Sequence, residues 1–206
     1  LSAFYFDIRK DALYCDAPDS LERRACLSVM DHVYHALVTW LAPILPFTME
    51  EVWLTRFPGE DSSVHLLDFA PVEAGWLNAD LAARFAKTRA ARRVVTGALE
   101  VERTAKTIGS SLEAAPTVYV SPELAAVIGS AQGFDTLCIT SGLKISTEAA
   151  PEGAFGLDAV AGVKVAFEKA SGEKCQRCWK ILPDVGTHAH PATCARCDAA
   201  LSAVGL

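Results

Sequence analysis

Residues Glu173 to Cys197 read EKCQRCWKILPDVGTHAHPATCARC, and this stretch holds four of the seven cysteines of the chain. They form two C-x-x-C pairs with fifteen residues between them. Each pair offers two thiolates from one tight turn, and four thiolates complete the tetrahedral coordination of zinc. The spacing therefore predicts one structural Zn²⁺ ion and a module that folds only with its metal. The predicted ligands are Cys175, Cys178, Cys194 and Cys197.

The other side chains of this stretch allow two interpretations. Four sulfur ligands leave no open coordination position, so the metal is not expected to be catalytic, and His188 and His190 are interpreted as solvated loop residues. Trp179 either shields the sulfurs or offers its ring to an unpaired base, with Arg177 and Lys180 beside it to meet phosphates. The two roles of the tryptophan are compatible with each other.

The remaining cysteines and the apolar pattern bear on the cellular setting. Cys15, Cys26 and Cys138 stand alone in apolar surroundings and are expected to be small buried hydrophobic residues. An odd total of seven argues against a framework made entirely of disulfides. No run reaches the roughly 18 apolar residues of a membrane span, and no signal segment opens the sequence. We therefore expect a cytoplasmic protein that does not associate with membranes.

Charge narrows the class of partner. The 206 residues carry a net charge of -6, which does not suit a general binder of nucleic acid. Between Arg84 and Lys106, however, seven basic side chains face only two acidic ones. This stretch is either a local surface for a phosphate backbone or a face occupied by solvent and salt bridges between domains.

Helical periodicity dominates the first part of the chain, and residues 1–75 are predicted to form a helical bundle. Asp19 and Glu22 have the spacing of a capping box at the start of a second helix. Thr48 and Glu51 repeat that spacing at the start of a third, shorter helix.

A long helix is expected next, from Trp76 or Asn78 to about Gly109. It carries two apolar ridges, and a helix with two apolar sides is usually packed between two bodies. Residues 76–111 are therefore predicted to be a connector packed on the bundle. Arg92 lies within one of the apolar ridges, which favours a structural role for it.

After the connector the sequence pattern changes from helical to β-rich. APTVYVS, TLCIT, GLKIST and GVKVAFEKA are β-rich runs, and a brief helix is expected after Ser121. No catalytic nucleophile or general base is assigned anywhere in the chain. The predicted fold class is multidomain α+β, with an N-terminal helical bundle (1–75), a long connector helix (76–111), a small α/β layer (112–170) and a C-terminal four-cysteine zinc-binding module (171–206).

Four stretches carry a family resemblance: LSAFYFDIRKDALYCDAPDS, LAPILPFTMEEVW, ALEVERTAKTIGSSLEA and the four-cysteine tail that begins GEKCQRCWK. Together, in this order along the chain, they resemble the C-terminal region of bacterial isoleucyl-tRNA synthetases. Synthetases for valine, leucine and methionine carry helices similar to the second stretch. The third stretch joined to the cysteine tail is more specific.

The resemblance implies a helical bundle of the anticodon-binding type and a zinc-bearing tail, both gripping the anticodon stem and loop of tRNA(Ile). Catalytic and editing domains would lie in the same polypeptide, which would join isoleucine to its tRNA with ATP as a monomeric class I ligase. The resemblance implies the same four cysteines as ligands. The residues expected near the RNA are Arg9 and Lys10 in the IRKD turn, and Arg177, Trp179 and Lys180 in the tail.

The sequence lacks the signature motifs of class I synthetases, which are H-I-G-H-like and K-M-S-K-S-like, and it has no P-loop or G-x-G-x-x-G. The chain alone is therefore expected to be catalytically inactive and not to bind the ATP that the full-length enzyme uses.

Two alternatives remain open. DNA-repair glycosylases end in a similar four-cysteine finger, although the helix before the tail does not resemble theirs. The tail is otherwise a purely structural module that pins the α/β layer to a larger enzyme.

Overall fold

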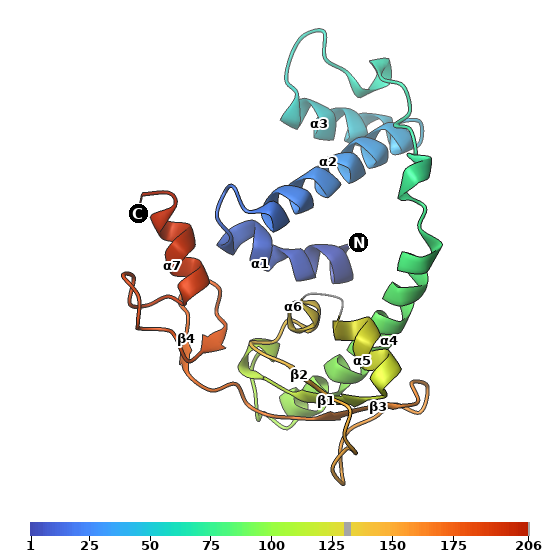
Figure 1. Cartoon of the computed structure of the whole chain (residues 1–206). Helices are drawn as coiled ribbons and strands as arrows, with labels where there is room; N and C mark the ends of the chain where they lie inside the picture. The colour runs from blue at the N-terminus through green and yellow to red at the C-terminus, as the bar shows by residue number, and fades with distance from the viewer. Residues whose placement is uncertain (130–132, 206) are drawn as a thin grey trace. The chain divides into compact units, whose positions relative to one another are not determined.

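The structure is a computed structural model that describes residues 1–129 and 133–205. It divides into two compact units, one of Leu1–Ala17 with Asn78–Leu206 and the other of Pro18–Leu77. The helices are η1 Ser2–Phe6, α1 Asp7–Cys15, α2 Leu21–Leu41, α3 Pro46–Arg56, η2 Val64–Leu66, η3 Ala74–Trp76, α4 Ala79–Thr104, η4 Ser111–Glu113, α5 Pro122–Gly129, α6 Phe134–Cys138 and α7 Ala195–Ser202. The strands are β1 Thr117–Val120, β2 Lys144–Ser146, β3 Val163–Ala166, β4 Glu173–Lys174 and β5 Ile181–Leu182 (Figure 1).

The unit Pro18–Leu77 is a helical pair closed by a loop. α2 packs against α3, and η2 packs against both. Trp53 lies in this core and donates its indole N–H to the Ser62 hydroxyl at 2.9 Å, which ties the loop to α3. The buried side chains of the unit's core are Val38, Ala42, Met49, Trp53 and Val64.

The helices predicted for this unit are present, but both predicted caps are wrong. Ser20, not Asp19, caps α2, because its hydroxyl accepts the backbone N–H of Arg23. α3 begins two residues before Thr48, at Pro46, where the fixed φ of proline suits the first helical turn. The two-residue capping-box pattern occurs often in sequences by chance. Only the backbone conformation determines which residue caps the helix.

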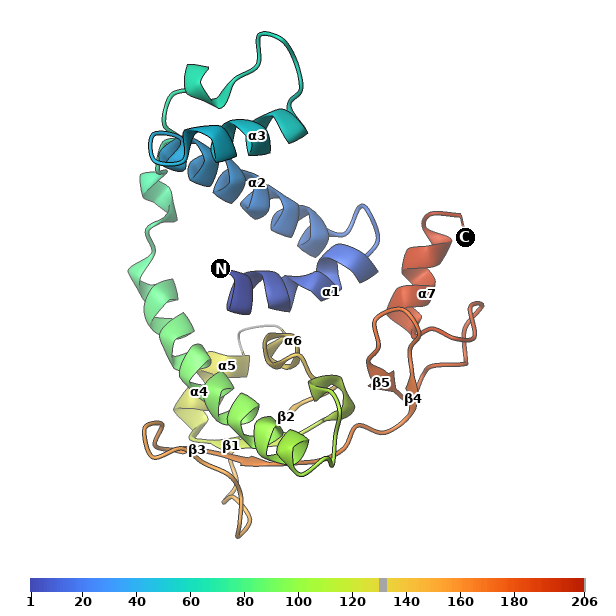
Figure 2. The same ribbon diagram turned by 180° about the vertical axis from the view of Figure 1, so that it is seen from behind.

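α4 is the predicted long helix, with a shorter extent. Asn78 caps it by accepting the N–H of Leu81 at 2.8 Å, and it ends at Thr104, short of Gly109. It packs against β3, α5 and α6 (Figure 2). The buried positions all lie from Thr88 onward, whereas Leu81 in the predicted ridge is exposed. Arg92 donates to the backbone carbonyl of Leu137 in α6, which confirms its predicted structural role.

A three-stranded sheet faces α4. The strand order is β2-β1-β3, with β1 parallel to β2 and antiparallel to β3. Val163 and Val165 of β3 are buried and Lys164 is exposed, as the alternating sequence predicts. Val94, Val95 and Val118 are also buried, so α4 and the sheet form one continuous core.

The predicted strand TLCIT is wrong, because these residues form α6 and the turn after it. Gly133 before the helix has φ +85°, and Ile139 after it has φ +58°, so both ends turn through the left-handed region. The β-rich composition is overridden because a short helix here buries Phe134 and Cys138 in the core beside α4.

The two compact units divide the chain differently from the predicted ranges. Leu1–Ala17, predicted as part of the bundle, belongs to the same unit as the α/β layer and the cysteine module. No helix in the described part of the chain is both long enough and apolar enough to cross a membrane.

Candidate zinc centre and nucleic-acid interface

The cysteine module is built from a two-stranded ribbon and one helix. β4 pairs with β5 in antiparallel fashion, and the loop between them carries Cys175 and Cys178. Cys194 is the N-cap of α7, and Cys197 lies in its first turn. Gly172 opens the ribbon at φ +115°, where a Cβ atom would lie 2.3 Å from the Leu182 carbonyl carbon, so only glycine fits there.

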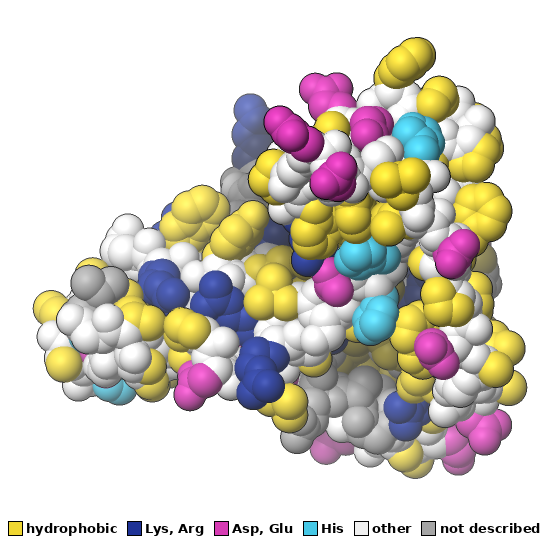
Figure 3. Space-filling view, turned by 90° about the horizontal axis from the view of Figure 1, so that it is seen from above, with side chains coloured by type: hydrophobic (Ala, Val, Ile, Leu, Met, Phe, Trp, Pro, Cys, Tyr) yellow, Lys and Arg dark blue, Asp and Glu magenta, His cyan; other side chains and the backbone are white. Residues whose placement is uncertain are grey.

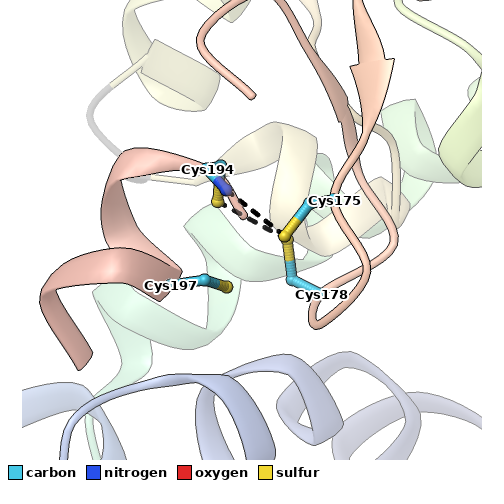
Figure 4. A group of neighbouring side chains, drawn as sticks. All are labelled: Cys175, Cys178, Cys194 and Cys197. Carbon is cyan, nitrogen blue, oxygen red and sulfur yellow. Dashed lines mark hydrogen bonds between the residues drawn. The ribbon is translucent and has the colours of Figure 1, made fainter. Parts of the chain in front are cut away.

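The four sulfurs form one buried cluster. All four lie within 4.8 Å of one another, and they point toward a common centre (Figure 4). The sulfurs of Cys178 and Cys194 are 3.8 Å apart. A tetrahedral zinc ion with Zn–S bonds of about 2.3 Å requires sulfurs separated by about 3.8 Å. The geometry therefore fits a single Zn²⁺ ion.

The ionisation of the thiols also fits a cation. Burial raises the pKa of Cys175, but N–H groups of Cys178, Arg177 and Cys194 point at its sulfur and bring the pKa down to about 6. Burial and neighbouring sulfurs raise the pKa of Cys178 to about 11 and also raise the pKa of Cys197. Four thiolates this close repel one another, so full deprotonation requires a bound metal.

The two histidines of the loop lie outside this cluster. His188 Nε2 is 3.2 Å from Asp184, whose carboxylate also accepts the N–H of Ala195 at 2.7 Å. His190 Nδ1 is 2.7 Å from Asp198. Both are part of a polar network that holds the loop against α7, so they are more constrained than the solvated residues predicted.

Trp179 stands out on the surface of the module. Its backbone N–H donates to the Cys175 carbonyl at 2.9 Å, and its φ of +64° is unusual for a bulky residue. The residue is 60% exposed, with Lys174 Nζ 5.7 Å from the ring centroid. Leu182 and Val185, rather than Trp179, pack against the sulfurs. The exposed ring favours the stacking interpretation over the shielding one.

The other predicted RNA contacts lie in different environments. Lys10 is exposed and pairs with Asp7 at 3.0 Å within α1, beside the half-buried Arg9. Lys180 pairs with Asp135 at 3.2 Å and is only 14% exposed.

Arg177 is directed into the protein as well. Its guanidinium donates to the backbone carbonyls of Cys15 and, at 3.1 Å, Tyr14. Arg177 and Lys180 therefore already have partners within the chain, and their contacts with RNA stay predictions.

Arg196 is a functional candidate that the sequence analysis missed. It binds both carboxylate oxygens of Asp11, at 2.6 and 2.7 Å, and Asp16 at 3.2 Å. One signal was available in the sequence: CQRC and CARC carry arginine at the same position. Arg196 in the second pair corresponds to Arg177 in the first.

Comparison with known proteins places the sequence in a family. Residues 1–119 match the anticodon-binding domain of tRNA ligases, which is more than half of the chain. The chain belongs to this family. Residues 172–200 of this anticodon-binding chain match a zinc finger found in FPG and IleRS. That match and the clustered thiols together support a structural Zn²⁺ in the module.

Similar proteins extend over nearly the whole chain. An isoleucine–tRNA ligase of Ruegeria pomeroyi is 60% identical over 201 residues, which is 98% of this chain and 21% of that protein. Isoleucine–tRNA ligases of Brucella abortus and Bartonella henselae are 54% and 52% identical, with the same coverage. The anticodon-binding chain thus spans about a fifth of the length of these relatives.

Proposed function

We propose that this chain is the tRNA-binding portion of an isoleucine–tRNA ligase, which attaches isoleucine to tRNA(Ile) with ATP in protein synthesis. Catalysis and editing would belong to other domains of the same polypeptide, acting as a monomer in the cytoplasm. The observation that carries the proposal is an exposed Trp179 directly after the first C-x-x-C pair of a four-sulfur cluster, in a chain of the anticodon-binding family.

We propose Cys175, Cys178, Cys194 and Cys197 as the zinc ligands. The ion would fix both C-x-x-C turns, called knuckles below. It would be a rigid structural support rather than a reactive centre, because four sulfurs fill its coordination sphere. His188 and His190 have carboxylate partners of their own and are not needed as ligands.

Recognition of an unpaired loop suits this surface. Bases in an anticodon loop are free to splay out and stack on aromatic rings, which is how proteins best distinguish RNA sequences. Trp179 would provide the stacking face, while Arg9 and Lys10 would meet phosphates. On the face drawn in Figure 3, lysine and arginine side chains are interspersed with hydrophobic and acidic ones. Such a surface suits selective contact better than uniform attraction to any nucleic acid.

The test is a titration of the zinc-loaded chain with RNA hairpins that differ only in the anticodon loop. The hairpin of tRNA(Ile) should bind more tightly than hairpins with altered loops. Trp179→Ala should weaken that binding by about 5- to 150-fold, the equivalent of 1–3 kcal/mol of stacking. Trp179→Phe, which keeps an aromatic face, should lose much less.

Two results would contradict the proposal. Preference for a DNA duplex with an abasic site would favour the glycosylase alternative. Folded, zinc-loaded Trp179→Ala with undiminished RNA affinity would leave the tail a structural module.

A further inference from the structure

Each C-x-x-C pair carries an arginine directly before its second cysteine. Arg177 precedes Cys178, and Arg196 precedes Cys197. Both guanidinium groups bind the C-terminal end of α1, more than 160 residues earlier in the sequence. The two C-x-x-C turns, which would share one metal, thus direct two equivalent arginine side chains to one helix.

Arg177 binds the backbone of this helix end. The last carbonyls of a helix have no partner within the helix and carry the negative end of its dipole. Arg177 donates to two of them, those of Tyr14 and Cys15. The Cys15 thiol donates in return to the Arg177 carbonyl, with sulfur and oxygen 3.6 Å apart. Arg177 therefore acts as a C-terminal cap supplied from outside the helix.

Arg196 binds the acidic side chains of the same helix end. Two parallel bonds join its guanidinium to Asp11, a geometry that the planar fork of arginine provides and lysine does not. A third bond reaches Asp16, which is buried. The burial of Asp16 and the bidentate pairing set this contact apart from ordinary surface ion pairs, which contribute little.

The relative position of the two arginines depends on the cysteine cluster. β4 and β5 are two residues each, and the buried cluster of the module consists of cysteines with Leu182 and Val185 packed on it. So small an apolar core cannot hold the knuckles together without the metal. Loss of zinc would therefore let the two guanidinium groups separate.

We propose that Arg177 and Arg196 are positioning residues that form a zinc-dependent clamp on the C-terminal end of α1. The clamp holds α1 from its C-terminal half, and Arg9 and Lys10 lie in the first turn of the same helix. Bound zinc would thus support RNA binding at two places, through the turn that presents Trp179 and through α1. The last step rests on the proposed function, whereas the clamp itself does not.

Hydrogen exchange of the α1 amides tests the clamp without RNA. In the zinc-loaded chain these amides should exchange slowly, and chelation should accelerate them about tenfold or more. The double variant Arg177→Ala, Arg196→Ala should exchange as fast as the chelated protein while still holding one zinc ion by metal analysis. Arg103→Ala, which removes an exposed arginine paired with Glu100 in α4, is the matched control and should leave α1 unchanged.

A second variant breaks the clamp from the helix side. Asp11→Asn, Asp16→Asn should also accelerate α1 exchange without changing any residue of the cysteine module. Slow α1 exchange in either zinc-loaded double variant would overturn the proposal. Slow α1 exchange in the chelated wild-type protein would overturn it as well.

RNA affinity tests whether the clamp positions Arg9 and Lys10. The clamp variants should weaken hairpin affinity in the wild-type background but add no further loss to Arg9→Ala, Lys10→Ala, because effects that act through the same contacts are not additive. Full additivity would overturn the positioning role. Failure of the wild-type chain to bind the hairpin would instead overturn the proposed function and leave the exchange result intact.

Discussion

At the scale of single residues, the seven cysteines are chemically different although all are buried. Four form the sulfur cluster, and Cys15 packs beside them. Cys26 and Cys138 are small buried hydrophobic residues outside that cluster, as predicted. Burial raises the pKa of Cys138 to about 12. Reactivity requires the thiolate, so exposure to reagent alone does not decide which cysteine reacts.

We therefore expect Cys138 to resist alkylation after zinc is removed. At pH 8 a thiol with a pKa of about 12 is ionised in only about one molecule in ten thousand. Chelation should make the four cluster cysteines reactive to iodoacetamide while Cys138 stays unmodified, as mass spectrometry of digested protein would record. Because the pKa is raised, the Cys138 rate should increase about tenfold per pH unit below pH 12. Alkylation of Cys138 as fast as the cluster would show that its core opens on chelation.

Trp179 shows how a local conformation serves a surface residue. A left-handed backbone is unfavourable for a bulky side chain and persists where the surroundings hold it. Here the backbone N–H of Trp179 donates a hydrogen bond to the Cys175 carbonyl within the turn that carries the first cysteine pair. The turn that presents the sulfurs therefore also turns the ring outward.

At the scale of elements, the N-cap of α2 shows that a sequence pattern can suit two neighbouring residues although only one of them caps the helix. Asp19 and Ser20 are adjacent and both suit a cap, but only Ser20 has its hydroxyl bonded to the N–H of Arg23. Ser20→Ala should lower the free energy of unfolding by about 1 kcal/mol. Asp19→Ala, at an exposed position before the helix, should change it by less than about 0.5 kcal/mol. Urea denaturation of the two variants provides the comparison, and a larger loss for Asp19→Ala would reverse the assignment.

Element type was predicted well where periodicity and burial agree. β3 alternates buried and exposed residues, and α4 has a cap signal followed by a long helical pattern. TLCIT failed because its β-rich composition competes with the burial of one short helical face, and packing beside α4 decides the outcome. Short apolar runs do not carry enough periodicity to distinguish the two.

At the scale of the whole molecule, net charge shapes how RNA is bound. A chain with a net charge of -6 has no general attraction to phosphate, so binding must depend on a few placed cations. If three to five phosphates are contacted, the logarithm of the association constant should fall with the logarithm of salt concentration at a slope of about -2 to -4. Titrations at several salt concentrations measure this slope. A slope near zero would contradict the cationic contacts, and Arg9→Ala, Lys10→Ala should make the slope shallower.

The sequence alone determined the mixed α+β class, the long helix and the clustering of the four cysteines. These depend on local rules, because two residues in a C-x-x-C turn necessarily present their sulfurs together and a helical period repeats within a few residues. For Trp179 the sequence left two interpretations open, and the exposed ring favours stacking on a base.

Only the tertiary structure decided where the arginines and lysine of the tail point. Lys180 finds Asp135 at a sequence separation of 45 residues, and Arg177 finds Tyr14 at 163. Arg196 finds Asp11 at a separation of 185 residues. No local pattern encodes such partners, because long flexible side chains take the direction in which folding places an acceptor. The spacing of the cysteines thus determines the metal-ligand geometry. The partners of the charged side chains around the cysteines depend instead on which elements the fold brings beside them.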